Sequence, residues 1–472
     1  MSIIIPSNSI VSGGFSVDNS CRFDGSSSYM SITPGSNMNL LRWTWSSWIK
    51  RGGQAGEQNI FCANNAASDY QNLMINANGE INFLNYVSNN VKGRKGTTRR
   101  LRDSSAWYHI VCVWDSANST ANDRMQIYVN GVRETAFGDN DNPDINQVGQ
   151  LGESGVATLV GTFVGTSAAF WNGYMAEVVL IDGLALTPTS FGEFDEDSGI
   201  WKPIDVSGLT FGTNGFYLDF ENSGALGADV SGNTNNFTVN NLTAIDQSTD
   251  TCTNNFATLN PLDNFFAGST LAEGNCKVTY LSGSGKYGYN TGTIALTSGK
   301  WYHEIKIVQS AGSNYNMFGI EEDVCQSVGH EYLSSSTGYV LNGNNGKIIA
   351  RGTEVTYGNA TAVNDIIGVY IDLDNNKLYF AENGTIMNSG TGQTIAAASA
   401  TKHGYYFVLG GDYSSGTVGI HEFNFGNPIF TGTDKTDANG YGSFEYDPSA
   451  GTFDSASKDF YALCTKNLAE YG

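Results

Sequence analysis

Apolar residues in this chain recur at every second position in short runs, which is the period of β-strands rather than of helices. The run Trp107–Trp114 is apolar on both alternating faces, which predicts a central strand buried on two sides. In Arg124–Val129 one face is apolar, as in a half-buried strand. Asn130-Gly131 then tolerates positive φ and predicts a tight turn before Val132–Glu134. Together these segments predict an antiparallel meander.

The same alternation extends over most of the chain. Leu41–Lys50 predicts a strand, and Gln71–Phe83 predicts a hairpin with Asn78-Gly79 at its turn. In the C-terminal half, Gly299–Ile307 alternates in the same way. One short helical turn is expected at Thr187-Pro188, because Thr caps helices and Pro starts them. The pattern therefore predicts an all-β fold.

Length and composition point to more than one domain. At 472 residues the chain exceeds an ordinary single domain. Its 57 Gly and its 12% aromatic and 15% charged content are typical of a turn-rich β protein. From the change in composition along the chain we predict an N-terminal arm at 1–20, a sandwich at 21–200, a linker with one strand at 201–265, a second sandwich at 266–430 and a C-terminal extension at 431–472.

Three motifs of the first sandwich follow one another in an order that resembles a known family. They lie in Phe23–Ile32, Trp107–Gly131 and Gly173–Thr187. This series resembles the opening, central and closing strands of laminin-G-like, concanavalin-type domains. The resemblance implies a jelly-roll sandwich that binds glycans or proteins and is usually not catalytic.

The second sandwich resembles the SPRY domain. The resemblance is carried by Gly299–Glu304 (GKWYHE), Gly368–Asp374 (GVYIDLD) and Phe380–Gly384 (FAENG). It implies a two-sheet sandwich that binds partners through its loops, with no catalytic residues to carry over. The expected fold is therefore all-β, with two antiparallel jelly-roll or concanavalin-type sandwiches joined by a polar linker and followed by a short C-terminal extension.

Two further stretches resemble virion proteins of tailed phages. One is the Asn/Ser/Thr-rich run 231–263, and the other is the ending Ala462–Leu468 (ALCTKNL). The resemblance implies a protein that is made in the host cytoplasm and ends in the virion.

Charge and cysteine usage narrow the classes of partner. The net charge is −22, and residues 1–150 are balanced, so the acidic excess lies downstream. Such acidity argues against a nucleic-acid partner. The seven cysteines are scattered without a CxxC pair and are typical of buried thiols. We find neither a signal peptide nor a segment for membrane insertion.

Six cations lie within eleven residues of this acidic chain. One interpretation is a contact with an anionic partner, such as sugar carboxylates, phosphates or the acidic face of another copy. A solvated loop is the alternative. The candidate binding residues are Lys92, Arg94, Lys95, Arg99, Arg100 and Arg102.

The loop Gly138–Asp144 is rich in oxygen ligands and is compatible with Ca²⁺. Its candidate metal ligands are Asp139, Asp141 and Asp144. The order of ligands in an EF-hand is absent, so a plain Asx-rich turn remains open. No other cofactor is expected.

The acidic run Glu193–Asp197 superficially resembles the acidic strand of laminarinase-type glycosidases. Glycosidases use two carboxylates that flank the scissile bond, and on a strand Glu193 and Asp195 would share one face. The glycosidase pattern ends in Glu, whereas Asp197 stands there in this chain. We expect a solvated acidic loop and no catalytic residue.

These observations predict a non-enzymatic structural or adhesion component of a phage particle. It would be a tail fibre, an appendage or a capsid-surface protein that binds host glycans or neighbouring subunits. We expect a homo-oligomer that contacts other virion proteins. Two alternatives remain open, namely a purely architectural assembly protein and a polysaccharide depolymerase.

Overall fold

The chain folds into two compact units, of which the first ends at Thr253 and the second begins at Asn254. The computed structural model describes residues 14–53, 56–163, 169–263, 269–280, 286–310, 315–323, 337–414, 418–454 and 459–472. Most of the predicted N-terminal arm, residues 1–13, lies outside this part. Both units consist of packed sheets in which all described strand pairs but one are antiparallel, which confirms the predicted fold class.

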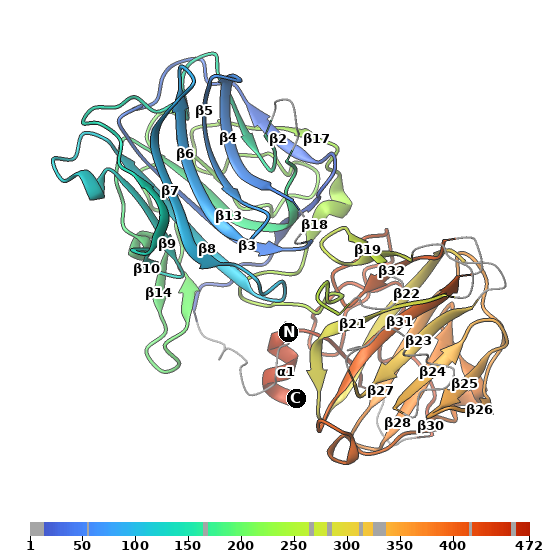
Figure 1. Ribbon diagram of the computed structural model, residues 1–472. Helices are drawn as coiled ribbons and strands as arrows, with labels where there is room; N and C mark the ends of the chain where they lie inside the picture. The colour runs from blue at the N-terminus through green and yellow to red at the C-terminus, as the bar shows by residue number, and fades with distance from the viewer. Residues whose placement is uncertain are drawn as a thin grey trace. The chain divides into compact units, whose positions relative to one another are not determined.

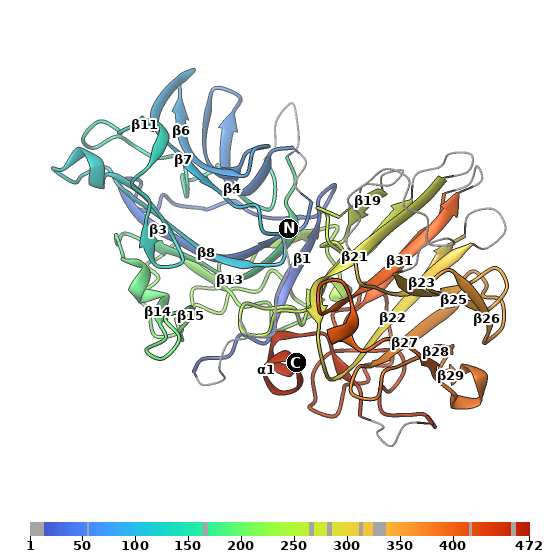
Figure 2. The same ribbon diagram turned by 60° about the horizontal axis from the view of Figure 1, so that its bottom comes forward.

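The first unit is a sandwich of two sheets, whose layers are visible in Figure 2. One sheet has the order β10–β9–β8–β3–β13–β1–β18, with β16 paired to β13, and the other has the order β11–β7–β6–β5–β4–β12–β2–β17. The hairpin β14–β15 stands apart from both. The bounds are β1 (Ser20–Asp24), β2 (Tyr29–Ile32), β3 (Arg42–Arg51), β4 (Gln58–Ala66), β5 (Asp69–Ile75), β6 (Glu80–Val87), β7 (Asn90–Arg100), β8 (Trp107–Asp115), β9 (Met125–Val129), β10 (Val132–Arg133), β11 (Phe137–Asp141), β12 (Ala157–Val160), β13 (Asn172–Asp182), β14 (Gly192–Phe194), β15 (Trp201–Pro203), β16 (Phe216–Leu218), β17 (Thr238–Asn240) and β18 (Gln247–Ser248).

Strand β8 is central and buried on both faces, as its sequence predicts. On one face, Ile110 and Trp114 belong to the core between the two sheets. On the other, Val111 and Val113 pack against side chains from residues 186–217. The segment that follows β13 therefore covers an apolar outer face that would otherwise meet water.

Residues 201–253, most of the linker predicted at 201–265, belong to the first unit and contribute four strands rather than one. Strand β15 pairs with β14, β16 with β13, β17 with β2 and β18 with β1. At the end of this segment Asp250 forms a buried ion pair with Lys50 of β3, at 2.6 Å between Oδ2 and Nζ. Trp107 Nε1 donates a hydrogen bond to the other oxygen of the same carboxylate at 3.0 Å. Isolated apolar residues such as Phe211 and Tyr217 anchor the polar stretch to the sheet.

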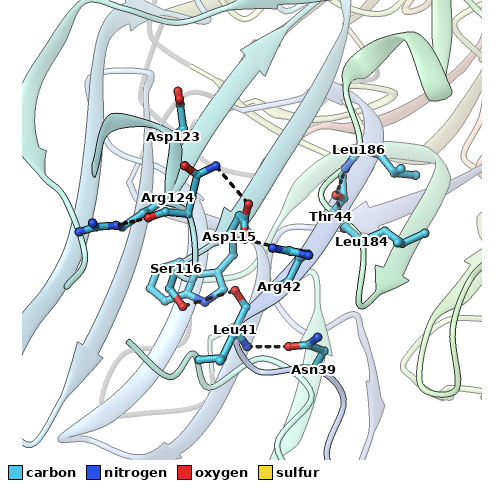
Figure 3. A network of polar contacts seen from close by, with 12 residues as sticks. Asn39, Leu41, Arg42, Thr44, Asp115, Ser116, Asp123, Arg124, Leu184 and Leu186 are labelled. Atoms are coloured by element: carbon cyan, nitrogen blue, oxygen red, sulfur yellow. Dashed lines mark hydrogen bonds and ion pairs between the residues drawn. The ribbon is translucent and has the colours of Figure 1, made fainter. Parts of the chain in front are cut away.

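A polar network fixes one end of β3 and β8 (Figure 3). Arg42 Nε donates to Asp115 Oδ1 at 2.9 Å across the two strands. Thr44 Oγ1 donates to the carbonyl of Leu184 and accepts from the amide of Leu186, both at 2.9 Å. These bonds hold the start of the covering segment against the sheet.

Glu177 is a buried carboxyl group at an irregular point of β13. The register between β13 and β3 shifts between Ala176 and Val179, and Glu177 has a φ of 51°. Such bulges re-aim a side chain. Tyr217 Oη donates to Glu177 Oε2 at 2.7 Å. Burial raises the pKa of Glu177 to about 8.

The raised pKa of Glu177 predicts a pH-dependent stability. The folded state holds the proton up to about pH 8, whereas the unfolded chain releases it near its ordinary pKa of about 4.3. Stability should therefore fall as the pH rises from about 5 to 8 and then level off. We expect Glu177→Gln, which keeps a hydrogen-bonding group, to flatten this fall and to raise the thermal midpoint above pH 8. Parallel pH profiles of the two proteins would contradict this assignment.

The second unit consists of two further sheets. One has the order β19–β20–β32–β22–β27–β28–β29, with β30 paired to β28 and β33 paired in parallel to β22, and the other has the order β21–β31–β23–β24–β25–β26. The bounds are β19 (Ser269–Ala272), β20 (Lys277–Tyr280), β21 (Lys286–Leu296), β22 (Lys300–Gln309), β23 (Asn316–Glu321), β24 (Gly338–Asn342), β25 (Lys347–Ala350), β26 (Thr353–Thr356), β27 (Ile366–Asp372), β28 (Lys377–Glu382), β29 (Thr385–Ile386), β30 (Gln393–Thr394), β31 (Tyr406–Ser414), β32 (Ile420–Asn424) and β33 (Tyr461–Ala462).

Helices are few in the described part of the chain. The α-helix α1 spans Thr465–Tyr471, near the C-terminus (Figure 1). The predicted turn after Thr187 is present as a 3₁₀ helix, and the 3₁₀ helices are Ala121–Asp123, Pro188–Ser190, Ala244–Asp246, Met387–Gly390 and Ala398–Ala400. No helix in the described residues has both the length and the apolar character needed to cross a bilayer.

The C-terminal extension covers an aromatic face of the second unit. Phe444 and Phe460 pack against Tyr302 of β22 and Tyr370 of β27. This face is opposite the core of the unit, to which the neighbouring Trp301 belongs. The sequence predicted a C-terminal extension at 431–472, and in the structure aromatic side chains of this extension pack on the face.

Glu304 is the polar anchor of this extension. Its carboxylate accepts hydrogen bonds from Tyr302 Oη at 2.9 Å and from Asn424 Nδ2 at 2.9 Å. It also accepts from the backbone amides of Glu445 and Tyr446, at 3.0 and 2.8 Å. Burial raises the pKa of Glu304, and these donors oppose that shift. One buried side chain of β22 thus holds the turn of the extension in place.

The described cysteines are buried free thiols, as the sequence predicted. They are Cys21, Cys62, Cys112, Cys252, Cys276 and Cys464. Burial raises the pKa of the Cys62 and Cys112 thiols, so these side chains behave as small apolar groups. The seventh, Cys325, lies outside the described residues.

Candidate functional site

The outer face of the sheet formed by β4–β7 and β11 carries a concentration of polar and aromatic side chains. Leu73 and Phe83 pair across β5 and β6 and belong to the core, so the residues that alternate with them face outward. The register places three cross-strand rows on this outer face: Met74, Asn82 and Gly96; Cys62, Asn72, Leu84 and Arg94; and Tyr70 with Tyr86.

A hollow of about 180 Å³ lies between β6, β7 and β11; we call it the β7 hollow. It is lined by Asn76, Glu80, Asn82, Gly96, Thr97, Thr98, Arg100, Gly138 and Asp139. Two of the lining residues are glycines. A Cβ added at Gly138 would meet no atom within 4 Å, and one at Gly96 would lie 3.1 Å from Asp139 Oδ2.

Both carboxylates of the β7 hollow are held by guanidinium groups of β7. Arg94 Nη2 lies 2.7 Å from Asp139 Oδ2, and Arg100 Nη2 lies 2.9 Å from Glu80 Oε1. The pKa of Glu80 is lowered by the hydrogen bond from Asn76 and by Arg100. These opposite charges cancel in pairs, so the hollow offers oriented donors and acceptors without a net field. Such a lining suits a neutral ligand rich in hydroxyl groups.

Asn82 adds an amide with unused hydrogen-bonding capacity. Its side chain is 4% exposed, and its Oδ1 has no hydrogen-bond partner among the described residues. In the neighbouring row, Asn72 Nδ2 donates to Asn59 Oδ1 at 2.7 Å, while Asn72 Oδ1 is likewise without a described partner. A buried acceptor that is left unpaired costs free energy, which a donor from a bound ligand would recover.

An aromatic group stands further along the same face. The rings of Tyr70 and Tyr86 lie 5.1 Å apart at an interplanar angle of 33°. Phe163 meets Tyr70 edge-on at 5.2 Å. Tyr86 is four positions after Asn82 on β6, which corresponds to about 14 Å along a strand. Both tyrosines are partly exposed, so an apolar platform is available beyond the β7 hollow.

The structure brings the two candidate sites of the sequence together. Strand β7, which carries most of the predicted cation cluster, pairs antiparallel with β11, which carries the acidic loop. Arg94 and Arg100 line or flank the β7 hollow, as described. Lys95 is buried and donates to the side chains of Asn140 and Asn142.

The remaining members of the cation cluster lie around this pairing. Arg99 forms an ion pair with Glu134, while Lys92 is partly exposed and Arg102 is exposed. Three of the six cations, Arg94, Arg99 and Arg100, are therefore neutralised by carboxylates within the chain.

The predicted metal ligands are distributed differently from a coordination shell. Asp139 pairs with Arg94, and Asp141 and Asp144 are exposed. Across the described ranges, no group of three or more His, Cys, Asp or Glu side chains is placed to hold a metal ion.

The acidic run Glu193–Asp197 lies in the β14–β15 hairpin. Lys202 Nζ lies 3.1 Å from Asp195 Oδ2 and 3.4 Å from Glu193 Oε1. Hydrogen bonds from Ser198 and Lys202 lower the pKa of Asp195 to about 2. A carboxyl group with so low a pKa holds no proton for general acid catalysis at neutral pH.

The sequence did not identify Glu80, Asn82, Tyr70 and Tyr86 as candidate site residues. The signal was present in Glu80–Val87, where Glu80, Asn82 and Tyr86 alternate with core positions. The alternation shows which side chains of β6 share a face, but it does not show which residues of the next strand lie beside them. The hollow forms because the register pairs β6 with β7.

Comparison with known families agrees with this architecture. A family model described as the concanavalin A-like lectin/glucanases superfamily matches residues 24–190. The model of the SPRY domain matches residues 300–408. A comparison with curated protein sequences gave no match.

Three solved structures are among those similar to parts of the chain. The SPRY domain of human HERC1 is 18% identical, with a TM-score of 0.29 and coverage of 35% of this chain and 96% of that domain. A proposed carbohydrate-binding protein from Bacteroides ovatus is 16% identical, with a TM-score of 0.33 and coverage of 48% and 58%. The heptameric SAP-like pentraxin from Limulus polyphemus is 18% identical, with a TM-score of 0.28 and coverage of 36% and 78%. From the two family matches and the two sandwiches, the chain carries a laminin-G-like domain of the concanavalin A-like lectin/glucanase superfamily followed by a SPRY domain.

Proposed function

We propose that the first unit binds a glycan on the outer face of its β4–β7 sheet and that the β7 hollow is the polar centre of this site. The observation that carries the proposal is the lining of the hollow, where paired charges and the unpartnered amide oxygen of Asn82 surround an open space within the described residues. Sugar hydroxyls both donate and accept hydrogen bonds, so they match carboxylates, guanidinium groups and amides at once. The Tyr70–Tyr86 pair supplies a surface on which a sugar ring would stack.

The proposed activity is binding without turnover. The concanavalin A-like superfamily contains lectins and glucanases, so the fold alone does not decide between them. A glycosidase needs a carboxyl group with a raised pKa as its general acid. In the β7 hollow the pKa of Glu80 is lowered instead, and Asp139 is engaged by Arg94.

A substitution at Gly138 tests the site with little risk to the fold. Gly138 lies on the edge strand β11, and a side chain there meets no atom within 4 Å. We expect Gly138→Val to narrow the β7 hollow and to weaken glycan binding at least about tenfold, and Asn82→Ala to act in the same direction. The measurement is a glycan array followed by calorimetry with the full chain.

The matched control is Gly208→Val, at another exposed glycine whose Cβ would meet no atom within 4 Å. It should bind like the parent protein. Equal glycan binding by the Gly138 and Gly208 variants would show that the glycan binds elsewhere on the chain. If no glycan binds at all, an architectural role is favoured. Release of reducing ends from the bound glycan would favour the depolymerase.

We also propose that this binding serves adhesion on a tailed-phage particle, in several copies and in contact with other virion proteins. This setting is supported by the resemblance of residues 231–263 and of Ala462–Leu468 to phage virion proteins. Mass spectrometry of purified particles from a phage that encodes the chain tests it. If the chain is absent from particles that contain the other structural proteins, the proposed role on the phage particle is wrong. The proposal that the first unit binds a glycan is not affected by that result.

A further inference from the structure

A second hollow, of about 90 Å³, lies near the opposite edge of the same sandwich; we call it the rim hollow. Its walls come from both sheets, since Thr158 belongs to β12 while Leu180 and Phe216 belong to β13 and β16. Strand β2 and the loop after it close one side. The lining residues are Ile32, Thr33, Pro34, Gly35, Gly152, Thr158, Leu180, Asn214, Phe216 and Asn235.

The rim hollow combines an apolar floor with one buried hydroxyl group. Leu180 and Phe216 belong to the core, and Ile32 packs against it. Thr158 is 2% exposed, and its Oγ1 has no hydrogen-bond partner among the described residues. A hydroxyl buried without a partner costs free energy. The site therefore provides a place for an apolar group next to a hydrogen-bonding group.

The mouth of the rim hollow is polar and held in place. Asn235 Nδ2 donates to the carbonyls of Thr213 and Gly215, at 3.1 and 2.9 Å. The backbone amide of Asn214 donates to Asp182 Oδ2 at 3.1 Å. The first two bonds hold the side chain of Asn235 and the third holds the backbone of Asn214, so both residues are fixed at the entrance. No Lys, Arg or acidic side chain is among the lining residues that the structure describes.

We propose that the rim hollow binds the acetyl group of an acetylated sugar. At about 90 Å³ the rim hollow has half the volume of the β7 hollow, so it suits a substituent of a few heavy atoms better than a whole sugar. The methyl group would lie on Leu180 and Phe216, and the carbonyl oxygen would accept a hydrogen bond from Thr158 Oγ1. The uncharged lining disfavours an anion, and a bare alkyl group would leave the hydroxyl unpaired.

The rim hollow and the β7 hollow are separate sites on the first unit. In the strand order, β11 and β7 stand at one end of the sheet and β2 is next to the last strand at the other end. Substitutions at the two hollows are therefore separable. A protein that uses both would recognise an N-acetylated or O-acetylated glycan at two points.

The test is saturation-transfer NMR on the full chain with N-acetylglucosamine, 6-O-acetylglucose, N-butyrylglucosamine and glucose as probes. We expect the acetyl methyl protons to receive the strongest saturation, and glucose and the bulkier butyryl sugar to bind weakly or not at all. The two acetylated probes distinguish an amide from an ester as the natural group. Equal signals from N-acetylglucosamine and glucose would overturn the proposal, as would no acetyl signal at millimolar ligand, which would mean a hollow filled by water only.

Two variants locate the binding. Thr158→Val removes the hydroxyl and keeps the shape, and we expect affinity for the acetylated sugar to fall by up to about tenfold without loss of thermal stability. Gly35→Leu adds bulk at the wall, where a Cβ would meet no atom within 4 Å, and should abolish the acetyl signal. Gly208→Val, at an exposed glycine that lines neither hollow, is the matched control and should leave that signal unchanged. Retained binding in both rim variants would refute the site even if glycan binding itself is established.

Discussion

Replacing Asp250 by alanine should destabilise the first unit by about 3–5 kcal/mol, the cost of leaving one member of a buried ion pair without its partner. The side chains of Lys50 and Asp250 are 1% and 0% exposed, and their charged atoms lie 2.6 Å apart. Asp250 also accepts from Trp107 Nε1, so the substitution leaves a second donor unsatisfied. Seven of the eight tryptophans lie in the first unit, so urea unfolding followed by tryptophan fluorescence reports on it.

Two controls distinguish the buried pair from a general effect of charge. Glu221→Ala removes an exposed acid of the same segment and should change stability by less than about 0.5 kcal/mol. The double variant Lys50→Met, Asp250→Leu removes both charges, and its free energy of unfolding should fall by less than that of Asp250→Ala alone. If the single and double variants lose the same amount, the pair is not the source of the effect.

Replacing Glu304 by alanine should free the C-terminal extension from the second unit. The substitution removes the acceptor of four hydrogen bonds, two of which come from the backbone of the extension. Each donor that stays buried without a partner costs about 1–3 kcal/mol, so we expect a loss of at least about 3 kcal/mol. Hydrogen–deuterium exchange should rise most in residues 444–454 and 459–464, because side chains of these segments cover the aromatic face of β22 and β27.

Glu354→Ala is the matched control in the same unit. Glu354 is an exposed carboxylate on the edge strand β26, where it forms an ion pair with Lys347. Exposed pairs contribute at most about 1 kcal/mol, so exchange in residues 444–454 and 459–464 should stay as in the parent protein. Unchanged exchange in Glu304→Ala would show that aromatic packing alone retains the extension.

The elements of the fold could be predicted because they depend on local alternation. Trp107–Trp114 is apolar at consecutive positions, and it forms β8 at the centre of a sheet with both faces covered. The turn at Asn130-Gly131 has φ values of 47° and 77°, as its residue types require. Family resemblance then indicated the class of both sandwiches.

The candidate site could not be predicted in the same way, because it depends on which strands become neighbours. Arg94 and Asp139 are far apart in the sequence, and the local pattern placed each in a separate candidate site. The antiparallel register of β7 and β11 places them in one ion pair. The covering role of residues 201–253 also escaped prediction, since it depends on sparse residues such as Phe211 within a polar stretch.

The position of β1 has a consequence for how the first unit is made. Strand β1 (Ser20–Asp24) pairs with β13 (Asn172–Asp182) on one side and with β18 (Gln247–Ser248) on the other. It therefore cannot complete its pairing until these two strands, which come much later in the chain, have been synthesised. At a synthesis rate of about 5–20 residues per second, its edges stay unpaired for roughly ten seconds or more after they leave the ribosome. Contacts between such distant segments also slow folding. Yield in recombinant expression should therefore improve at low temperature or with added chaperones, which protect nascent strands during that interval.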